Sequence, residues 1–165
     1  MKVKTRLGLT GVCDYYLGCT NTTYTDTGGT LKHWYGYHSE KTMGYPYAKV
    51  GRSAMYVTRP PSKLCIGDHI WVVEGDQHTP TRFTLVDCFV YSDAAHPPFD
   101  PSYSRFGIRI LGTHSILRSP IPLNRADRWF AELHSRFITK QKFFHQITSE
   151  REIVNGLCST ISIKP

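Results

Sequence analysis

The sequence predicts an α+β fold in which a curved mixed or antiparallel sheet is followed by helices near the C-terminus. Two observations carry this prediction. Short segments rich in β-branched and aromatic residues, bounded by glycine and proline, recur between residues 53 and 111. After residue 124 the apolar residues instead repeat at the spacing of a helix. Because no internal repeat or linker-like stretch divides the chain, residues 1–165 are predicted to form a single domain.

The N-terminal part is predicted to be mostly irregular. Residues 6–12 alternate weakly between apolar and other residues, which indicates an opening strand. Residues 13–30 are rich in Thr, Asn, Asp and Gly and indicate a long loop. Residues 31–47 then hold five aromatic rings and two histidines, interrupted by glycine and proline. We expect no long regular element in this segment, and we expect some of its rings to face solvent.

Several strands are predicted in the middle of the chain. They cover 53–58, 69–74, 82–91 and 106–111, with a further short strand at 114–117. The segment 82–91 is apolar on both faces, so we expect a central strand covered on both sides. A loop over 92–104, which contains three prolines, follows it.

Two helices are predicted after the strands. Asn124 stands at an N-cap position, and the apolar stripe that follows it contains Ala126, Trp129, Phe130, Leu133 and Phe137. This stripe should pack on the sheet. Ser149 and Glu152 have the spacing of a capping box and predict a second helix. Between the two, the basic aromatic segment 140–145 is expected to form a short helical turn.

Composition excludes several classes of protein. A chain that is 40% hydrophobic and 13% aromatic has enough apolar surface to fold, and no apolar run is long enough to cross a bilayer. We see no secretory signal, and the five widely spaced cysteines do not resemble a disulfide framework, so we expect a cytoplasmic protein. The net charge is +7, and the excess comes from residues 1–65 and 99–165, which flank an acidic stretch. This distribution favours a polyanionic partner.

Motifs for catalysis and metal binding are weak. The sequence has no nucleophile elbow, no glycine-rich phosphate loop and no metalloprotease motif, so we assign no catalytic residue, cofactor or metal. One alternative is general acid–base catalysis by His33 and His38 with Lys41, as in a nuclease. Another is zinc binding by two cysteines and two histidines, although their spacing departs from a zinc finger. These four residues are Cys13, Cys19, His33 and His38.

The aromatic residues point to a binding pocket instead. Faces of Trp and Tyr stack on a nucleobase with about 1–3 kcal/mol per base, and polar neighbours then read the edge of the base. The candidate residues for this pocket are Trp34, Tyr35, Tyr37 and Trp71, with Ser39 or Asp93 as readers of the edge. Lysines and histidines surround Trp34, which indicates a wet surface, whereas Trp71 is alternatively a core residue of a buried strand.

Residues 66–75 (Ile-Gly-Asp-His-Ile-Trp-Val-Val-Glu-Gly), followed by the strand 82–91, resemble the core of PUA-superfamily domains of the EVE, YTH and ASCH type. The segment Trp34-Tyr35-Gly36-Tyr37 falls where those domains carry pocket aromatics. The resemblance covers residues 31–111 and is closest to EVE-like readers of modified bases. It implies a β-pseudobarrel flanked by helices, with a pocket for one extruded base. Trp34 and Tyr37 would form cage walls, Trp71 a floor, and Asp93 an edge reader.

We therefore expect a nucleic-acid-binding reader of a modified base, first of all 5-methyl- or 5-hydroxymethylcytosine in duplex DNA. The resemblance also implies a nuclease domain or subunit as a partner, as in modification-dependent restriction. The residues expected to contact phosphates are Lys32, Lys41, Arg52, Arg105 and Arg109. Two alternatives stay open: an RNA-binding or RNA-processing enzyme that uses His33 and His38, and a protein-interaction module.

Overall fold

The computed structural model describes residues 31–162 except 60, 97–105, 107 and 114. The strands in this part of the chain are β1 (His33–Ser39), β2 (Ala54–Val57), β3 (His69–Gly75), β4 (Phe83–His96), β5 (Ile108–Gly112), β6 (Ile121–Leu123) and β7 (Phe144–Gln146). The helices are α2 (Glu40–Met43), the 3-10 helix η1 (Tyr47–Val50), α3 (Arg128–Leu133), the π-helix η3 (His134–Ile138) and α4 (Arg151–Ser162). The protein is α+β, as the sequence predicts.

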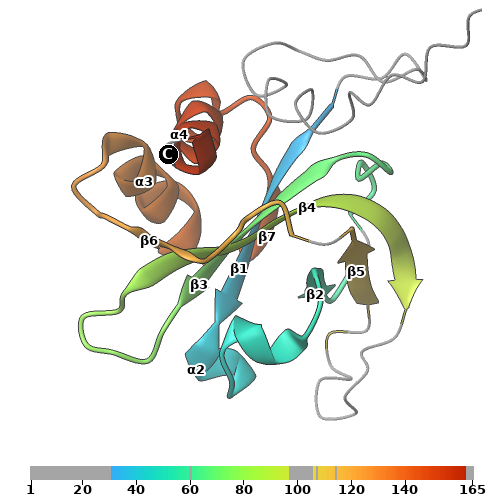
Figure 1. Ribbon diagram of the computed structural model, residues 1–165, viewed down its shortest axis with the longest axis horizontal. Helices are drawn as coiled ribbons and strands as arrows, with labels where there is room; N and C mark the ends of the chain where they lie inside the picture. Colours follow the sequence, from blue (N-terminus) through green and yellow to red (C-terminus); the bar gives the residue numbers. More distant parts are fainter. Residues whose placement is uncertain (1–30, 60, 97–105, 107, 114, 163–165) are drawn as a thin grey trace, which may run out of the picture.

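The strands form a curled mixed sheet that closes into a half-barrel (Figure 1). Their order is β2-β5-β4-β3-β1-β7, with β6 also paired to β4. Strands β1 and β3 are parallel, and the other pairs are antiparallel. The long strand β4 pairs with β3 along its first part and with β5 along its last part, where its register shifts twice. Such irregularities increase local twist, which explains how one strand serves both parts of the curled sheet.

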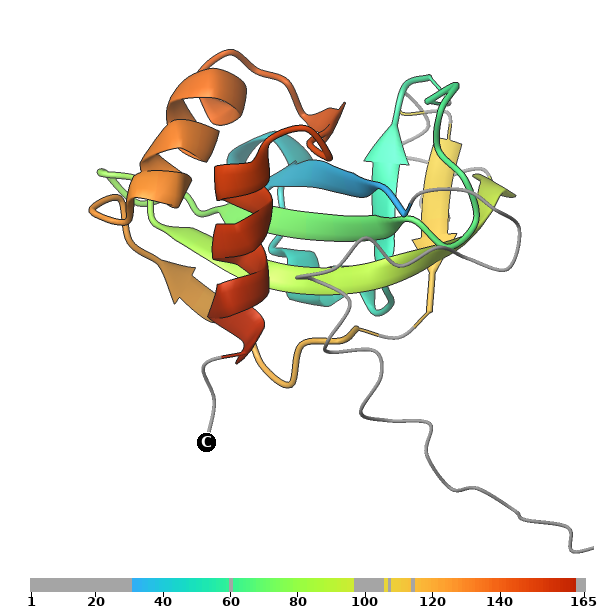
Figure 2. The same ribbon diagram turned by 90° about the horizontal axis from the view of Figure 1, so that it is seen from above.

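Helices α3 and α4 cover one face of the sheet, and the other face is enclosed by the curl itself together with α2 and η1. Figure 2 shows α3 and α4 side by side at one end of the molecule, away from β2 and β5. The buried residues between helices and sheet include Tyr35, Trp71, Val73, Leu85, Phe130, Leu133, Phe137, Ile153 and Leu157. The opposite face contributes a second core with Trp34, Met43, Tyr47, Met55, Ile70, Val72, Phe89 and Ile110. The predicted packing of the C-terminal helices on the sheet is confirmed.

Strand β1 corrects the expectation that residues 31–47 contain no long regular element. Successive side chains of a strand point to opposite faces, and here both faces are buried, so the segment lacks the apolar-polar alternation of a half-exposed strand. Gly36 lies in the middle of this strand. A Cβ atom at this position would lie 2.8 Å from Cε of Met55, so the absence of a side chain leaves room for Met55. The glycine that indicated a break therefore lies inside a strand, where it lets the Met55 side chain pack closely.

The helix starts also differ from the prediction. Helix α3 begins at Arg128, because Asn124 uses its side chain to accept from the backbone N–H of Ala126 in a turn. The capping box is not formed: Glu152 bonds to Arg128 at 2.9 Å instead of closing back on Ser149. Helix α4 accordingly begins at Arg151.

Three shorter predictions are wrong. Strand β4 continues to His96, so the first residues of the predicted loop 92–104 belong to the sheet. The short strand lies at Ile121–Leu123 rather than at 114–117, and segment 140–145 leads into strand β7 instead of a helical turn. The predictions for 6–12 and 13–30 fall outside the described residues. Within the described part of the chain, no helix is long and apolar enough to cross a membrane.

Candidate nucleic-acid interface

Trp34 is a core residue, contrary to the wet surface that its neighbours indicate. Only 5% of it is exposed, and its indole Nε1 donates to Oδ2 of Asp68 at 2.9 Å. Its ring stacks on Phe144 of β7 with centroids 5.4 Å apart. The neighbouring Lys32 does not make the surroundings of Trp34 wet, because its ammonium group donates to the carbonyl of Lys63 at 2.7 Å.

Tyr35 and Trp71 are completely buried under the helices. They are register partners on the parallel strands β1 and β3, so their side chains enter the same layer. The indole N–H of Trp71 donates to Nδ1 of His33 at 3.1 Å, which satisfies the only polar atom of that side chain. Trp71 is therefore a core residue of a buried strand, which is the alternative to its role in a pocket that the sequence also allows. Neither ring shares a cavity with Trp34.

Tyr37 and Ser39 do border one cavity, of about 60 Å³, at the end of β1 beyond strand β7. The other residues around it come from β1, α2, β2 and two loops: His38, Thr42, Met43, Ala54, Met55, Tyr56, Phe106 and Phe143. The ring of Tyr37 stacks on Phe143 with centroids 5.9 Å apart and an interplanar angle of 12°. Phe143 is 47% exposed, so this wall of the cavity meets solvent.

Polar groups of this cavity are held in defined states. Nε2 of His38 lies 2.9 Å from the carbonyl oxygen of Tyr45, and because a carbonyl only accepts, Nε2 carries the proton. Burial lowers the pKa of His38, although Glu74 at 4.0 Å opposes the shift, so the ring is neutral near pH 7. Its Nδ1 is therefore a hydrogen-bond acceptor. Oγ of Ser39 accepts from the backbone N–H of Thr42 at 3.2 Å and caps α2, which leaves its hydroxyl proton to donate.

The predicted phosphate-binding residues lie in different parts of the molecule. Lys41 is exposed on α2, which borders the cavity, and Arg52 is exposed just before β2, which borders it as well. Arg109 lies on β5 as the register partner of Tyr56. Lys32 precedes β1 at the opposite end of that strand, roughly 23 Å from Ser39 at strand spacing. Arg105 lies outside the described residues, as does the side chain of Asp93, whose backbone belongs to β4.

The geometry separates the two histidines of the nuclease alternative. His33 and His38 lie five positions apart on β1, which puts their side chains on opposite faces, roughly 16 Å from each other along the strand. His33 contacts Trp71 beneath the helices, whereas His38 contacts Tyr45 and Tyr47 on the other side. General acid–base catalysis by this pair needs both rings at one bond, and the structure does not bring them together.

The structure likewise lends no support to the zinc alternative. Cys13 and Cys19 lie outside the described residues, and among the residues described no group of three His, Cys, Asp or Glu side chains is placed to hold a metal ion. His33 also accepts from Trp71 with one of its ring nitrogens.

Sequence reasoning missed most of the cavity. The sequence suggests His38 as a catalytic group or a zinc ligand and not as part of a pocket, and it places Met55, Tyr56, Phe106 and Phe143 in strands or in a helical turn. The one usable signal is the pair Phe143-Phe144 in a basic segment, which is typical of an exposed contact surface rather than a core. Met55 and Tyr56 reach the site only because β2 pairs with β5 and closes the curl.

Comparisons with protein-family models, with curated proteins and with solved structures gave no match for this chain.

Proposed function

We propose that this protein is a nucleic-acid-binding reader that takes one extruded base into the cavity beside Tyr37, Ser39 and Phe143. The observation that carries the proposal is the combination of aromatic walls, a neutral histidine acceptor and exposed cations in one place. Aromatic faces stack on a base, and lysine and arginine neutralise the phosphates on either side of it. The curled sheet with helices on one face is compatible with the PUA-like pseudobarrel that the sequence resembles.

The cavity favours a base with an exocyclic amino group. Nδ1 of His38 is an acceptor, and cytosine and adenine present amino groups that donate. The apolar residues Met43 and Met55 border the same space and suit a methyl group better than water. A C5-substituted cytosine in duplex DNA combines both features, so it is the first candidate.

A base enters only if the cavity opens. Its present volume of about 60 Å³ is smaller than the roughly 150 Å³ of an engineered cavity that holds benzene. Phe143 is the most exposed aromatic residue of the wall and so the ring with the least packing to lose when it moves. We infer that Phe143 swings aside and then stacks on the base.

Binding of fluorescent duplexes that differ in one cytosine, plain, 5-methyl or 5-hydroxymethyl, tests the proposal at two salt concentrations. We expect a preference for a modified duplex of about tenfold or more, equivalent to about 1.4 kcal/mol, that persists when salt weakens both complexes. Phe143→Ala should reduce this ratio, and Ile66→Ala should not, because Ile66 is 75% exposed and does not border the cavity.

Two results would contradict the proposal. Equal affinity for all duplexes that vanishes as salt rises would leave only nonspecific charge attraction. Absence of binding to DNA or RNA at low salt would favour a protein-interaction module instead. Cleavage of either nucleic acid would require an enzyme site other than the separated pair His33 and His38.

A further inference from the structure

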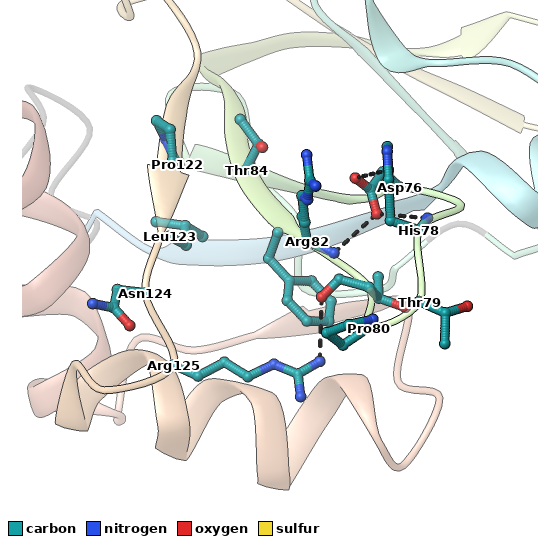
Figure 3. A pocket seen from close by; sticks show the side chains of 12 residues that line it. Asp76, His78, Thr79, Pro80, Arg82, Thr84, Pro122, Leu123, Asn124 and Arg125 are labelled. Carbon is teal, nitrogen blue, oxygen red and sulfur yellow. Dashed lines mark hydrogen bonds and ion pairs between the residues drawn. The ribbon is translucent and has the colours of Figure 1, made fainter.

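A second hollow lies at the turn between β3 and β4. It is an open groove of about 830 Å³, with one wall formed by residues 76–84 and the other by residues 122–125, at the end of β6 and just after it (Figure 3). The groove is far larger than the cavity beside Tyr37. Its lining includes three threonines and two arginines, beside apolar surface from proline, phenylalanine and leucine side chains.

Two arginines stand on different walls of this groove. Arg82, at the start of β4, is exposed, and its guanidinium has no hydrogen bond or ion pair with any described residue. Arg125 comes from the opposite wall, where its guanidinium lies 5.0 Å from the centre of the Phe83 ring and donates to the carbonyl of Thr81 at 3.4 Å. No carboxylate in the described part of the chain pairs with either cation, and stacking on Phe83 holds the Arg125 guanidinium in place.

The single carboxylate in the lining is occupied by its own turn. Oδ1 of Asp76 accepts from the backbone N–H groups of His78 and Arg82 at 3.0 and 2.9 Å. Its Oδ2 lies 2.6 Å from Nδ1 of His78. These bonds stabilise the turn and direct the carboxylate toward the loop backbone, so its repulsion of an anion in the groove is partly compensated.

We propose that this groove binds the sugar–phosphate backbone of a nucleic acid strand. Unpaired guanidinium groups and threonine hydroxyls are typical donors to phosphate oxygens. An open groove suits an extended chain that passes through it, whereas a small anion would need an enclosed site. The proposal rests on the proposed function for the identity of the polymer, but it concerns a different set of residues.

The groove adjoins the cavity through Tyr37. A Cβ atom on Gly75 would lie 2.0 Å from the hydroxyl oxygen of Tyr37, so that side chain reaches across Gly75, the residue before Asp76. The ring of Tyr37 is also 6.5 Å from that of Phe83, which lines the groove. A strand whose base entered the cavity would thus have the groove as the next surface along its backbone.

The test measures duplex binding over a range of salt concentrations for Arg82→Gln, Arg125→Gln and the double variant. Arg151→Gln is the matched control, because Arg151 is exposed at the start of α4 and outside the groove. Each lost phosphate contact should reduce the slope of log K against log salt by about 0.9. We expect a reduction of about 2 in the double variant and none in the control, while the preference for modified cytosine is retained.

The outcomes separate this proposal from the proposed function. An unchanged slope in the double variant would overturn the groove and leave the base reader intact. A reduced slope in a protein that does not discriminate between duplexes would support the groove and refute the reader. Thermal melts check that each variant is folded, and Arg82→Gln alone remains informative if Arg125→Gln unfolds the protein, because the Arg82 side chain makes no described polar contact.

Discussion

Replacement of Trp34 distinguishes a core residue from a pocket wall. The side chain is 5% exposed, and large-to-small substitution of a buried tryptophan costs about 3–5 kcal/mol of stability. The hydrogen bond from its indole to Asp68 accounts for part of this cost, because a bond to a charged group contributes about 1.5–3 kcal/mol. Among the described residues, Asp68 would then retain two backbone donors, the N–H of Cys65 at 2.9 Å and that of Lys32 at 3.3 Å.

Denaturant unfolding of Trp34→Ala and Trp34→Phe separates these contributions. We expect Trp34→Ala to lose about 3–5 kcal/mol, which corresponds to roughly 6–20 °C in melting temperature for a chain of this size. Trp34→Phe keeps an aromatic ring for stacking on Phe144 and should lose about 1.5–3 kcal/mol. Phe143→Ala is the control, and since Phe143 is half exposed it should lose much less.

A loss below about 1 kcal/mol for Trp34→Ala would refute this reasoning, since buried aromatic truncations cost several times more. If that variant also lost its preference for modified cytosine, Trp34 would be a pocket wall after all, as its lysine and histidine neighbours indicate.

Two further predictions concern buried polar groups. Tyr47→Phe should cost about 1.5–3 kcal/mol of stability in denaturant unfolding, because the Tyr47 hydroxyl donates to Oδ2 of the buried Asp87 at 2.8 Å, and Oδ1 of Asp87 has no partner among the described residues. A change below about 0.5 kcal/mol, the usual scale for a surface site, would show that Asp87 does not depend on this hydroxyl. Burial and the neighbouring His69 lower the pKa of His33 from 6.5 to about 4. As the pH falls, His33 therefore takes up a proton in the unfolded state before it does so in the folded state. The stability of the folded protein should then decrease between pH 6.5 and pH 4, by about 2 kcal/mol at pH 5. Melting His33→Gln beside the wild type across this range checks the second prediction, because the variant should show a flatter profile and parallel profiles would contradict it.

Much of the fold could be predicted because its signals are local. The strands around residues 54–57, 69–75 and 108–112 follow from β-branched and aromatic residues between glycine and proline. The stripe that ends at Phe137 predicts a helical segment facing the sheet, although its last turn is a π-helix. These features depend on spacing along the chain, which the sequence states directly.

Strand β1 and the helix starts were harder to predict because their signals conflict. Gly36 is typical of a turn, yet here it admits Met55 from another strand, a contact that only the folded sheet creates. Glu152 has the spacing of a capping box, yet Arg128 of α3 competes successfully for its carboxylate. In both cases a partner distant in sequence overrides the local preference.

The sequence by itself determined the fold class, the positions of the central strands and an excess of positive charge. Only the tertiary structure decided which aromatic residues are core and which border a cavity. Trp34, Tyr35 and Tyr37 are chemically similar and almost adjacent, but the alternation of a strand and the placement of β7 bury the first two and bring the third to the edge of the sheet. Burial depends on what packs against each face, and that information comes from strands and helices far away in the chain.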